Sequence, residues 1–165
     1  MTQPIYTRPA QPAGIHIRPA TLADLPTLLE FEQGVIAAER PMDPTIRQGP
    51  INYYNLPAML ANPDVHLLVA ELDGALVGSG YARIDPARHY LDHTHHAYLG
   101  FMYTDPAHRG KGVNQRIIAA LRQWAHSRHL TELRLDVYTT NEAAIRAYEK
   151  AGFTPHLLQM RLRVI

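Results

Sequence analysis

The residues whose types and spacing point most clearly to chemistry lie in the stretch HRGKGVN, residues 108–114. This stretch follows an apolar run that predicts a strand and precedes the clearest amphipathic helix pattern of the chain. The start of a helix presents about four backbone N–H groups without partners and a partial positive charge. Gly110 and Gly112 let that backbone approach an anion without an intervening Cβ. The pattern predicts a phosphate-binding loop, with Arg109 and Lys111 adding positive charge.

Two familiar phosphate-binding motifs do not fit this loop. A Walker loop needs Ser or Thr after Gly-Lys, whereas Gly112 follows Lys111 here. A dinucleotide-binding fingerprint needs a third glycine, where the chain has Gln115, and an acidic residue at the end of the next strand. Taken alone, the loop therefore leaves open a glycine-rich turn that only begins a helix.

A second candidate group lies in NEAAIRAYEKAGF, residues 141–153. Asn141 and Tyr148 are seven residues apart, or about two helical turns, so they lie along one helix face. A tyrosine hydroxyl there can reach a ligand beside a sheet. Because Ile145 on the same helix is also apolar, this segment alone favours Tyr148 as a packed aromatic residue.

The elements that must position these groups alternate between strands and helices. Period-two patterns predict strands over 15–18, 65–72, 75–84, 97–104, 133–137 and 158–165. Helical patterns run from about 24 to 36, and over 53–61, 113–128 and 141–152. Asp73-Gly74 predicts a tight hairpin. This order predicts a mixed α/β fold, with a central mixed β-sheet flanked by helices.

Composition excludes several classes of protein. The 165 residues are 46% hydrophobic and 19% charged, which predicts one globular domain over 15–165 after a flexible, proline-containing leader over 1–14. Lys and Arg number 16 against 15 Asp and Glu, too even a balance for a general nucleic-acid binder. Cysteine is absent, which excludes disulfides, thiolate zinc sites and an acyl-cysteine intermediate. Without a secretory signal or an apolar run of about 20 residues, we expect no membrane span and a cytoplasmic location.

Together the two segments resemble the GNAT superfamily of acyl-CoA-dependent N-acetyltransferases. The resemblance is specific over residues 97–153, through YTDP, HRGKGV, LRLDVY and NEAAIRAYEKAGF, and looser over 15–96. It implies transfer of an acetyl group from acetyl-CoA, as co-substrate, to the amine of a small molecule or a peptide. With no cysteine, direct attack in one ternary complex is the simplest route.

The resemblance also implies roles for individual residues. In this family the loop holds the acyl-CoA pyrophosphate through backbone N–H groups, and the matching positions are Arg109, Gly110, Lys111, Gly112 and Val113. Asn114 stands where Gly or Ala is usual, but we expect binding to survive because the donors are backbone groups.

The strand before the loop resembles the strand that pairs with the pantetheine arm of acyl-CoA. The matching stretch is Phe101 to Thr104, with Met102 and Thr104 as the expected contacts and one of its N–H groups as the oxyanion donor. Asn141 is expected to contact the CoA arm, and Tyr148 to protonate the leaving thiolate.

The general base is where the sequence departs from a common family pattern. Attack requires a neutral amine, so a group must take its proton. Many members carry a Glu on the strand before the loop, whereas residues 97–102 contain no carboxylate. The substitutes are Glu71, Asp136, Tyr98 and His96, although Asp136 has the alternative of pairing with an arginine.

The acceptor is not identified by the sequence. His89, His93, His95 and His96 raise a zinc hypothesis, but a polar loop that forms one wall of the acceptor pocket is favoured, so no metal is expected. Residues 32–60 are expected to form the other wall. Acidic residues within and just before this region can attract a cationic amine, with basic residues mixed in: Glu30, Glu32, Glu39 and Asp43, with Arg40 and Arg47.

A rival interpretation is a non-catalytic module that binds acyl-CoA as a sensor or assembly subunit. The missing strand carboxylate favours this module, whereas Tyr148 and the complete loop favour the enzyme. The alternating apolar residues of 158–165 predict a strand at a sheet edge, and from that we expect a homodimer.

Overall fold

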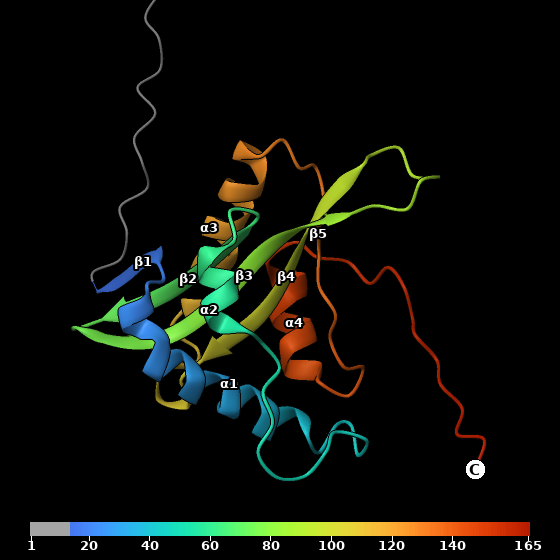
Figure 1. Ribbon diagram of the computed structural model, residues 1–165, viewed down its shortest axis with the longest axis horizontal. Coiled ribbons are helices and arrows are strands. Elements are labelled where there is room, and N and C mark those ends of the chain that lie inside the picture. The colour runs from blue at the N-terminus through green and yellow to red at the C-terminus, as the bar shows by residue number, and fades with distance from the viewer. Residues whose placement is uncertain (1–13) are drawn as a thin grey trace, which may run out of the picture.

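A five-stranded sheet forms the centre of the computed structural model, which describes residues 14–165 (Figure 1). Its strands in spatial order are β1 (Ile15–Pro19), β2 (Val65–Leu72), β3 (Ala75–Pro86), β4 (His95–Thr104) and β5 (Leu133–Arg134). The first four pair antiparallel, and β5 pairs parallel with β4. The predicted mixed α/β fold is confirmed, and the predicted leader lies outside the described residues except for Gly14.

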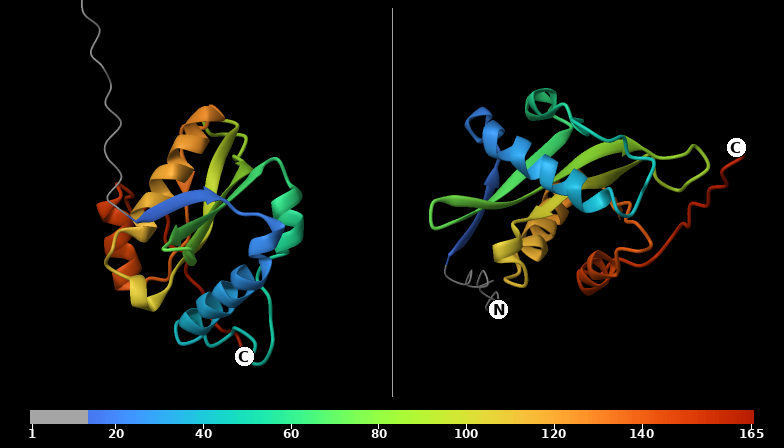
Figure 2. Two further views of the ribbon diagram at one scale, coloured as in Figure 1. Left: turned by 90° about the vertical axis from the view of Figure 1, so that its left-hand side faces the viewer. Right: turned by 90° about the horizontal axis from the view of Figure 1, so that it is seen from below.

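Helices cover both faces of the sheet. After a 3₁₀ turn, η1 (Leu22–Asp24), come α1 (Leu25–Glu39) and α2 (Leu56–Ala61) on one face. A second 3₁₀ turn, η2 (Pro106–His108), leads toward α3 (Val113–Ser127), which lies with α4 (Glu142–Lys150) on the opposite face (Figure 2). None of the helices in the described residues is both long and apolar enough to cross a membrane.

Close packing of α3 on β3 fixes where α3 begins. Val113 and Ile117 on α3 are fully buried against the sheet. A Cβ added to Gly78 would lie 2.7 Å from Val113, and one added to Gly80 would lie 2.7 Å from Ile117. The two glycines of β3 therefore allow a helix–sheet approach that alanine would prevent, and this approach holds the N-terminus of α3 beside the end of β4.

A β-bulge interrupts β4 near its middle. Ser79 pairs with Tyr103 and Tyr81 with Gly100, so β4 has one more residue than β3 over this interval. Phe101 takes the left-handed conformation with φ 54°. As a result Leu99 packs on the α3 side of the sheet, whereas Phe101 packs on the α1 side. Bulges of this kind redirect a strand and its backbone groups next to functional sites.

A buried carboxylate on α1 holds the loop that precedes α2. Glu32 is fully buried, and its oxygens accept hydrogen bonds from Asn52 Nδ2 at 2.7 Å, the Tyr53 N–H at 2.6 Å and the Tyr54 N–H at 2.8 Å. A carboxylate satisfied by three donors is a stable way to bury a charged group. Glu32 thereby sets the position of both tyrosines.

Three predicted elements differ from the structure. The strand predicted over 133–137 is only two residues long, and the helix predicted over 53–61 begins at Leu56. The strand predicted over 158–165 is wrong: this segment lies outside every strand in the structure, and its apolar side chains are exposed. The sheet-edge strand from which we expected a homodimer is therefore absent from the described chain.

We predict that Glu32→Gln lowers the free energy of unfolding by about 1–3 kcal/mol, because an amide cannot accept from three N–H donors as a carboxylate does. Urea unfolding followed by circular dichroism measures this loss. Glu30→Gln is the matched control, since Glu30 is exposed on the same helix, and it should change stability by less than about 0.5 kcal/mol. Equal midpoints for the two variants would show that Glu32 does not anchor the loop.

Candidate active site

The predicted phosphate loop leads directly into the N-terminus of α3. Gly110 has φ 75° and Gly112, the residue before the helix, has φ 80°. Both conformations are unfavourable for residues with a Cβ, so the glycines are required by the backbone path. No side chain caps the first N–H groups of α3. Uncapped N–H groups at the positive end of a helix dipole are suited to bind phosphate oxygens.

Side chains around this helix start are arranged to leave the backbone accessible. Arg109 and Lys111 are exposed, Asn114 is half-buried, and Val113 points into the core. The structure thus brings together all six loop residues predicted from the sequence, and the basic side chains can contribute long-range attraction for an anion.

The C-terminal half of β4 has one open backbone edge. Its partner β5 pairs only with Ala97 and Tyr98, so within the described chain no strand continues beside Leu99 to Thr104. The predicted contacts Met102 and Thr104 lie in this stretch, which ends just before the phosphate loop. An extended ligand can add to such an edge as another strand would.

Buried contacts hold the bulge of β4 in place. The Ser79 hydroxyl donates to the Phe101 carbonyl oxygen at 3.1 Å, with Ser79 fully buried. The Tyr54 ring packs on the Phe101 ring with centroids 4.9 Å apart. Both partners restrict the backbone where an oxyanion donor is predicted, which is a condition for preorganised electrostatic stabilisation.

Tyr148 and Asn141 lie on α4, as the spacing predicted. The Tyr148 ring packs edge-on against Phe153 with centroids 5.9 Å apart. Burial and the negative charge of Glu39 raise the pKa of Tyr148 to about 12, so its hydroxyl keeps its proton at neutral pH. Asn141 caps α4: its Oδ1 accepts from the Ala144 N–H at 3.2 Å, which leaves the amide NH₂ as the group offered to a ligand.

Two of the four predicted base candidates are in contact with each other. The Tyr98 hydroxyl donates to Asp136 Oδ2 at 3.1 Å, and the Arg83 guanidinium lies 4.6 Å from the centre of the Tyr98 ring. Burial and the adjacent Asp136 charge raise the pKa of Tyr98 well above its usual value. Tyr98 is therefore the proton donor of the pair, and Asp136 accepts from a phenol rather than pairing with an arginine.

Among the described residues, neither of the other two base candidates hydrogen-bonds to this pair. His96 is 9% exposed, and burial lowers the pKa of its imidazole, which favours the neutral form. Glu71 is on β2 and accepts from Arg18 Nε at 3.1 Å. Because β3 separates β2 from β4 in the sheet, Glu71 is not brought together with the loop or with Tyr148.

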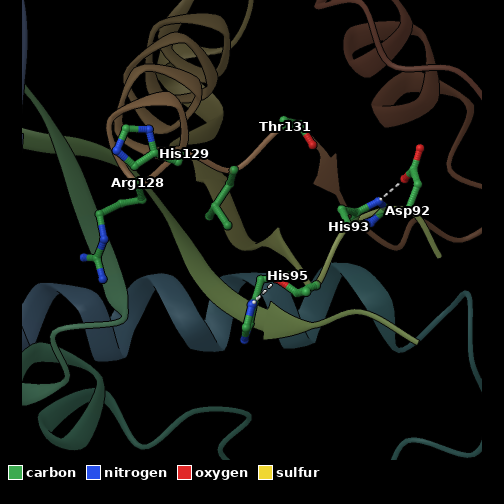
Figure 3. A pocket seen from close by; sticks show the side chains of 8 residues that line it. Asp92, His93, His95, Arg128, His129 and Thr131 are labelled. Atoms are coloured by element: carbon green, nitrogen blue, oxygen red, sulfur yellow. Dashed lines mark hydrogen bonds and ion pairs between the residues drawn. The ribbon is translucent and has the colours of Figure 1, made fainter. Parts of the chain in front are cut away.

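The histidine-rich connection before β4 lines a pocket away from the predicted phosphate loop. This pocket of about 440 Å³ lies between residues 92–95 and 128–131, at the C-terminal end of α3 (Figure 3). His93 contacts Asp92 at 2.8 Å and Glu132 at 3.2 Å. No group of three His, Asp or Glu side chains within residues 14–165 is placed to hold a metal ion. His93 and His95 line the pocket, whereas none of the residues predicted to bind acetyl-CoA or to act as the acid or base does.

Sequence reasoning missed the residues that support the site. Glu32 was considered only as an attraction for a cation, yet it stands beside Phe31 in the apolar stripe of α1, a signal of burial. Ser79 lies between Gly78 and Gly80, and this run of small residues within a strand signals close backbone approach. The sequence carries no comparable signal for the bulge at Phe101.

Comparison with known proteins agrees with this geometry. The sequence profile of the Acetyltransferase (GNAT) family matches residues 32–153. The chain is 31% identical over 99 residues to the aminoglycoside N(6′)-acetyltransferase type 1 of Klebsiella aerogenes, covering 60% of this chain and 65% of that protein. It is 34% identical over 97 residues to the N-alpha-acetyltransferase RimI of Mycobacterium tuberculosis, covering 57% of this chain and 55% of that protein. The matches therefore span less than two thirds of either relative.

The fold has a solved counterpart that contains acetyl-CoA. A predicted acetyltransferase of Clostridium acetobutylicum with acetyl-CoA superimposes with a TM-score of 0.68 at 18% identity, covering 91% of this chain and 96% of that one. At this identity the likeness supports a common fold. Since the family profile covers more than half of the chain, the resemblance inferred from the sequence is confirmed, and the chain belongs to the GNAT acetyltransferase family.

Proposed function

We propose that this protein is an N-acetyltransferase that moves the acetyl group of acetyl-CoA to a primary amine. The observation that carries the proposal is the uncapped, glycine-led N-terminus of α3 at the end of the open edge of β4. The helix N-terminus suits a pyrophosphate group, and the open strand edge suits an extended pantetheine arm. Relatives whose names specify aminoglycoside and N-alpha acetylation support an amine of a small molecule or a peptide as the acceptor.

Acetyl-CoA binding is assigned to the residues predicted from the sequence. The N–H groups from Arg109 to Asn114 hold the pyrophosphate, and the backbone from Met102 to Thr104 pairs with the pantetheine arm. The amide NH₂ of Asn141 adds a donor from the N-terminus of α4. No step in this scheme uses a metal ion.

Catalysis then depends on two proton transfers, one from the amine to a base and one from Tyr148 to the leaving thiolate. The neutral amine attacks the thioester carbonyl, whose oxygen is stabilised by a backbone N–H of residues 101–104. Tyr148, whose pKa is raised to about 12, is protonated at neutral pH and gives its proton to the departing thiolate. The C–N bond forms and the C–S bond breaks without an acyl-enzyme intermediate.

We place the general base, which removes the proton of the attacking amine, among the groups near β4. Glu71 is held by Arg18 on the far side of β3, which argues against its role. Two other groups can take the proton of the amine, directly or through water. They are His96, whose neutral form is favoured by burial, and Asp136, which accepts a hydrogen bond from the Tyr98 hydroxyl. A homodimer and a cytoplasmic location stay predictions.

Thioester consumption against a panel of amines tests the proposal. We expect release of free CoA with at least one acceptor among an aminoglycoside, a diamine and peptides with a free α-amine. The rival, a non-catalytic acyl-CoA module, predicts calorimetric binding of acetyl-CoA without CoA release on any amine. Absence of acetyl-CoA binding would contradict both.

We predict that Gly112→Trp abolishes acetyl-CoA binding, because a bulky side chain at φ 80° would strain the loop and cover the N–H groups of α3. Lys111→Ala should weaken binding only about two- to five-fold, since an exposed charge is screened by salt. Isothermal titration calorimetry with both variants measures the difference. Normal affinity in a folded Gly112→Trp variant would show that the phosphates bind elsewhere.

We predict that Tyr148→Phe lowers turnover by about ten- to a hundred-fold, because the ring is retained and only the acid is lost. Acetyl-CoA affinity should change little, since its contacts are mainly backbone groups. Turnover and melting temperature are measured on the same preparation. Wild-type turnover in a normally folded variant would remove Tyr148 from the mechanism, whereas reduced stability with unchanged turnover would indicate a packing role.

A further inference from the structure

The C-terminal segment 154–165, called the tail below, carries a row of apolar side chains that no other described residue covers. Alternate side chains in it are apolar and 65–90% exposed: Leu158, Met160, Leu162 and Val164. The tail belongs to no helix or strand, and its backbone makes no hydrogen bond to the other residues that the structure describes. Monomeric proteins rarely expose a contiguous apolar row of this kind, so the row indicates an interaction surface.

One ion pair fixes the direction of the tail. Arg161 donates to Asp43 at 2.9 Å and to the Thr45 hydroxyl at 3.2 Å, both in the loop that follows α1. Alternate side chains of an extended segment point to opposite sides, so the even-numbered apolar row points away from this loop. Figure 1 shows the tail leaving the end of α4 and running out beyond the sheet. The tail therefore does not pair with the strands of its own chain.

The same chain has a sheet edge that lacks a strand. β5 is the last strand of the sheet, so no strand of the described chain pairs with its outer edge. Residues 135–137 continue the alternation of β5 as Leu, Asp and Val, and their backbone groups make no hydrogen bond to other described residues. Unpaired backbone groups at a sheet edge are a template for another strand. The chain thus offers one strand-like tail and one open edge.

Helix α4, next to this edge, is also incompletely packed. None of its residues is buried, although Ile145 and Tyr148 are apolar in character and lie along one side of it, whereas five residues of α3 on the same face of the sheet are buried (Figure 2). Phe153, just after α4, packs on the same core cluster as Leu135, which places the helix end beside the open edge. The tail, the edge and α4 therefore all lack a packed neighbour.

We propose that the tail of a second copy of this chain adds as a strand to the outer edge of β5, with its even-numbered apolar row packed toward α4. Each copy offers one edge and one tail, so reciprocal exchange about a two-fold axis leaves neither of them unpaired. The tail, the edge and α4 amount to about 25 residues in each copy, within the roughly 20–30 per side of a stable interface. The exchange also completes the packing of the helix that carries Tyr148.

The mass and the hydrogen exchange of the full chain test the proposal together. Light scattering after size exclusion should give twice the mass of one chain at micromolar concentration. Amides within 135–137 and 156–164 should exchange about a hundred-fold more slowly than unstructured amides, because each segment pairs with the other copy. Protection of both segments at the mass of one chain would show that the tail covers its own edge. A dimer without this protection would show a different interface, and either result overturns the proposal.

A matched pair of variants tests the apolar row itself. Leu162→Glu and Gln159→Glu add the same charge to opposite sides of the tail, and both side chains are exposed within one chain, so neither change disturbs its fold, as circular dichroism checks. Leu162→Glu should weaken the dimer by about a hundred-fold or more, since it buries a charge among apolar side chains, and should restore fast exchange at 135–137. Gln159→Glu should keep the mass and the protection of the wild type.

Equal masses for the two variants overturn the proposal. Neither measurement uses acetyl-CoA or an amine, so the result does not depend on whether the protein transfers acetyl groups.

Discussion

The divergence of β4 from β5 is the constraint on which the rest of the structure depends. β4 remains paired with β3 along its length, while β5 accompanies it only at Ala97 and Tyr98. Backbone groups left unpaired in a sheet must be satisfied by water or by another chain or ligand. The bulge at Phe101 adds to this divergence, because it turns the strand and changes which face its side chains reach. The helices then close around an edge that the sheet itself leaves unpaired.

Helix α1 uses two carboxylates on the same helix in opposite ways. Glu32 is buried but receives three strong hydrogen bonds, so its charge is fully compensated and its role is to hold a loop. Glu39 is half-buried, and burial raises the pKa of its carboxyl because the charged form loses hydration. The first arrangement stabilises the fold, whereas the second makes the charged form of the carboxylate less favourable than it is in water.

Local features of the chain were predictable from the sequence, and features that depend on distant contacts were not. The hairpin at Asp73-Gly74, the helix from Val113 and the glycine loop before it follow from short-range patterns, and all three are present. The segment 158–165 alternates like a strand, but alternation does not supply a partner strand, and none pairs with it in the described chain. The sequence likewise could not separate buried Glu32 from exposed Glu30, since the partners of Glu32 lie in another segment.

The surroundings of Tyr148 set its protonation state before any proton transfer. The negative charge of Glu39 contributes to the raised pKa of Tyr148, because it disfavours a second negative charge on the phenol. Burial makes the larger contribution, because the charged phenolate would lose its hydration, and both effects keep the phenol protonated at neutral pH. A phenol with a lower pKa gives its proton to a thiolate more readily. Tyr148 is therefore fully protonated at neutral pH but a weaker acid than an ordinary tyrosine, which limits how much the proton transfer proposed for it can accelerate thioester cleavage.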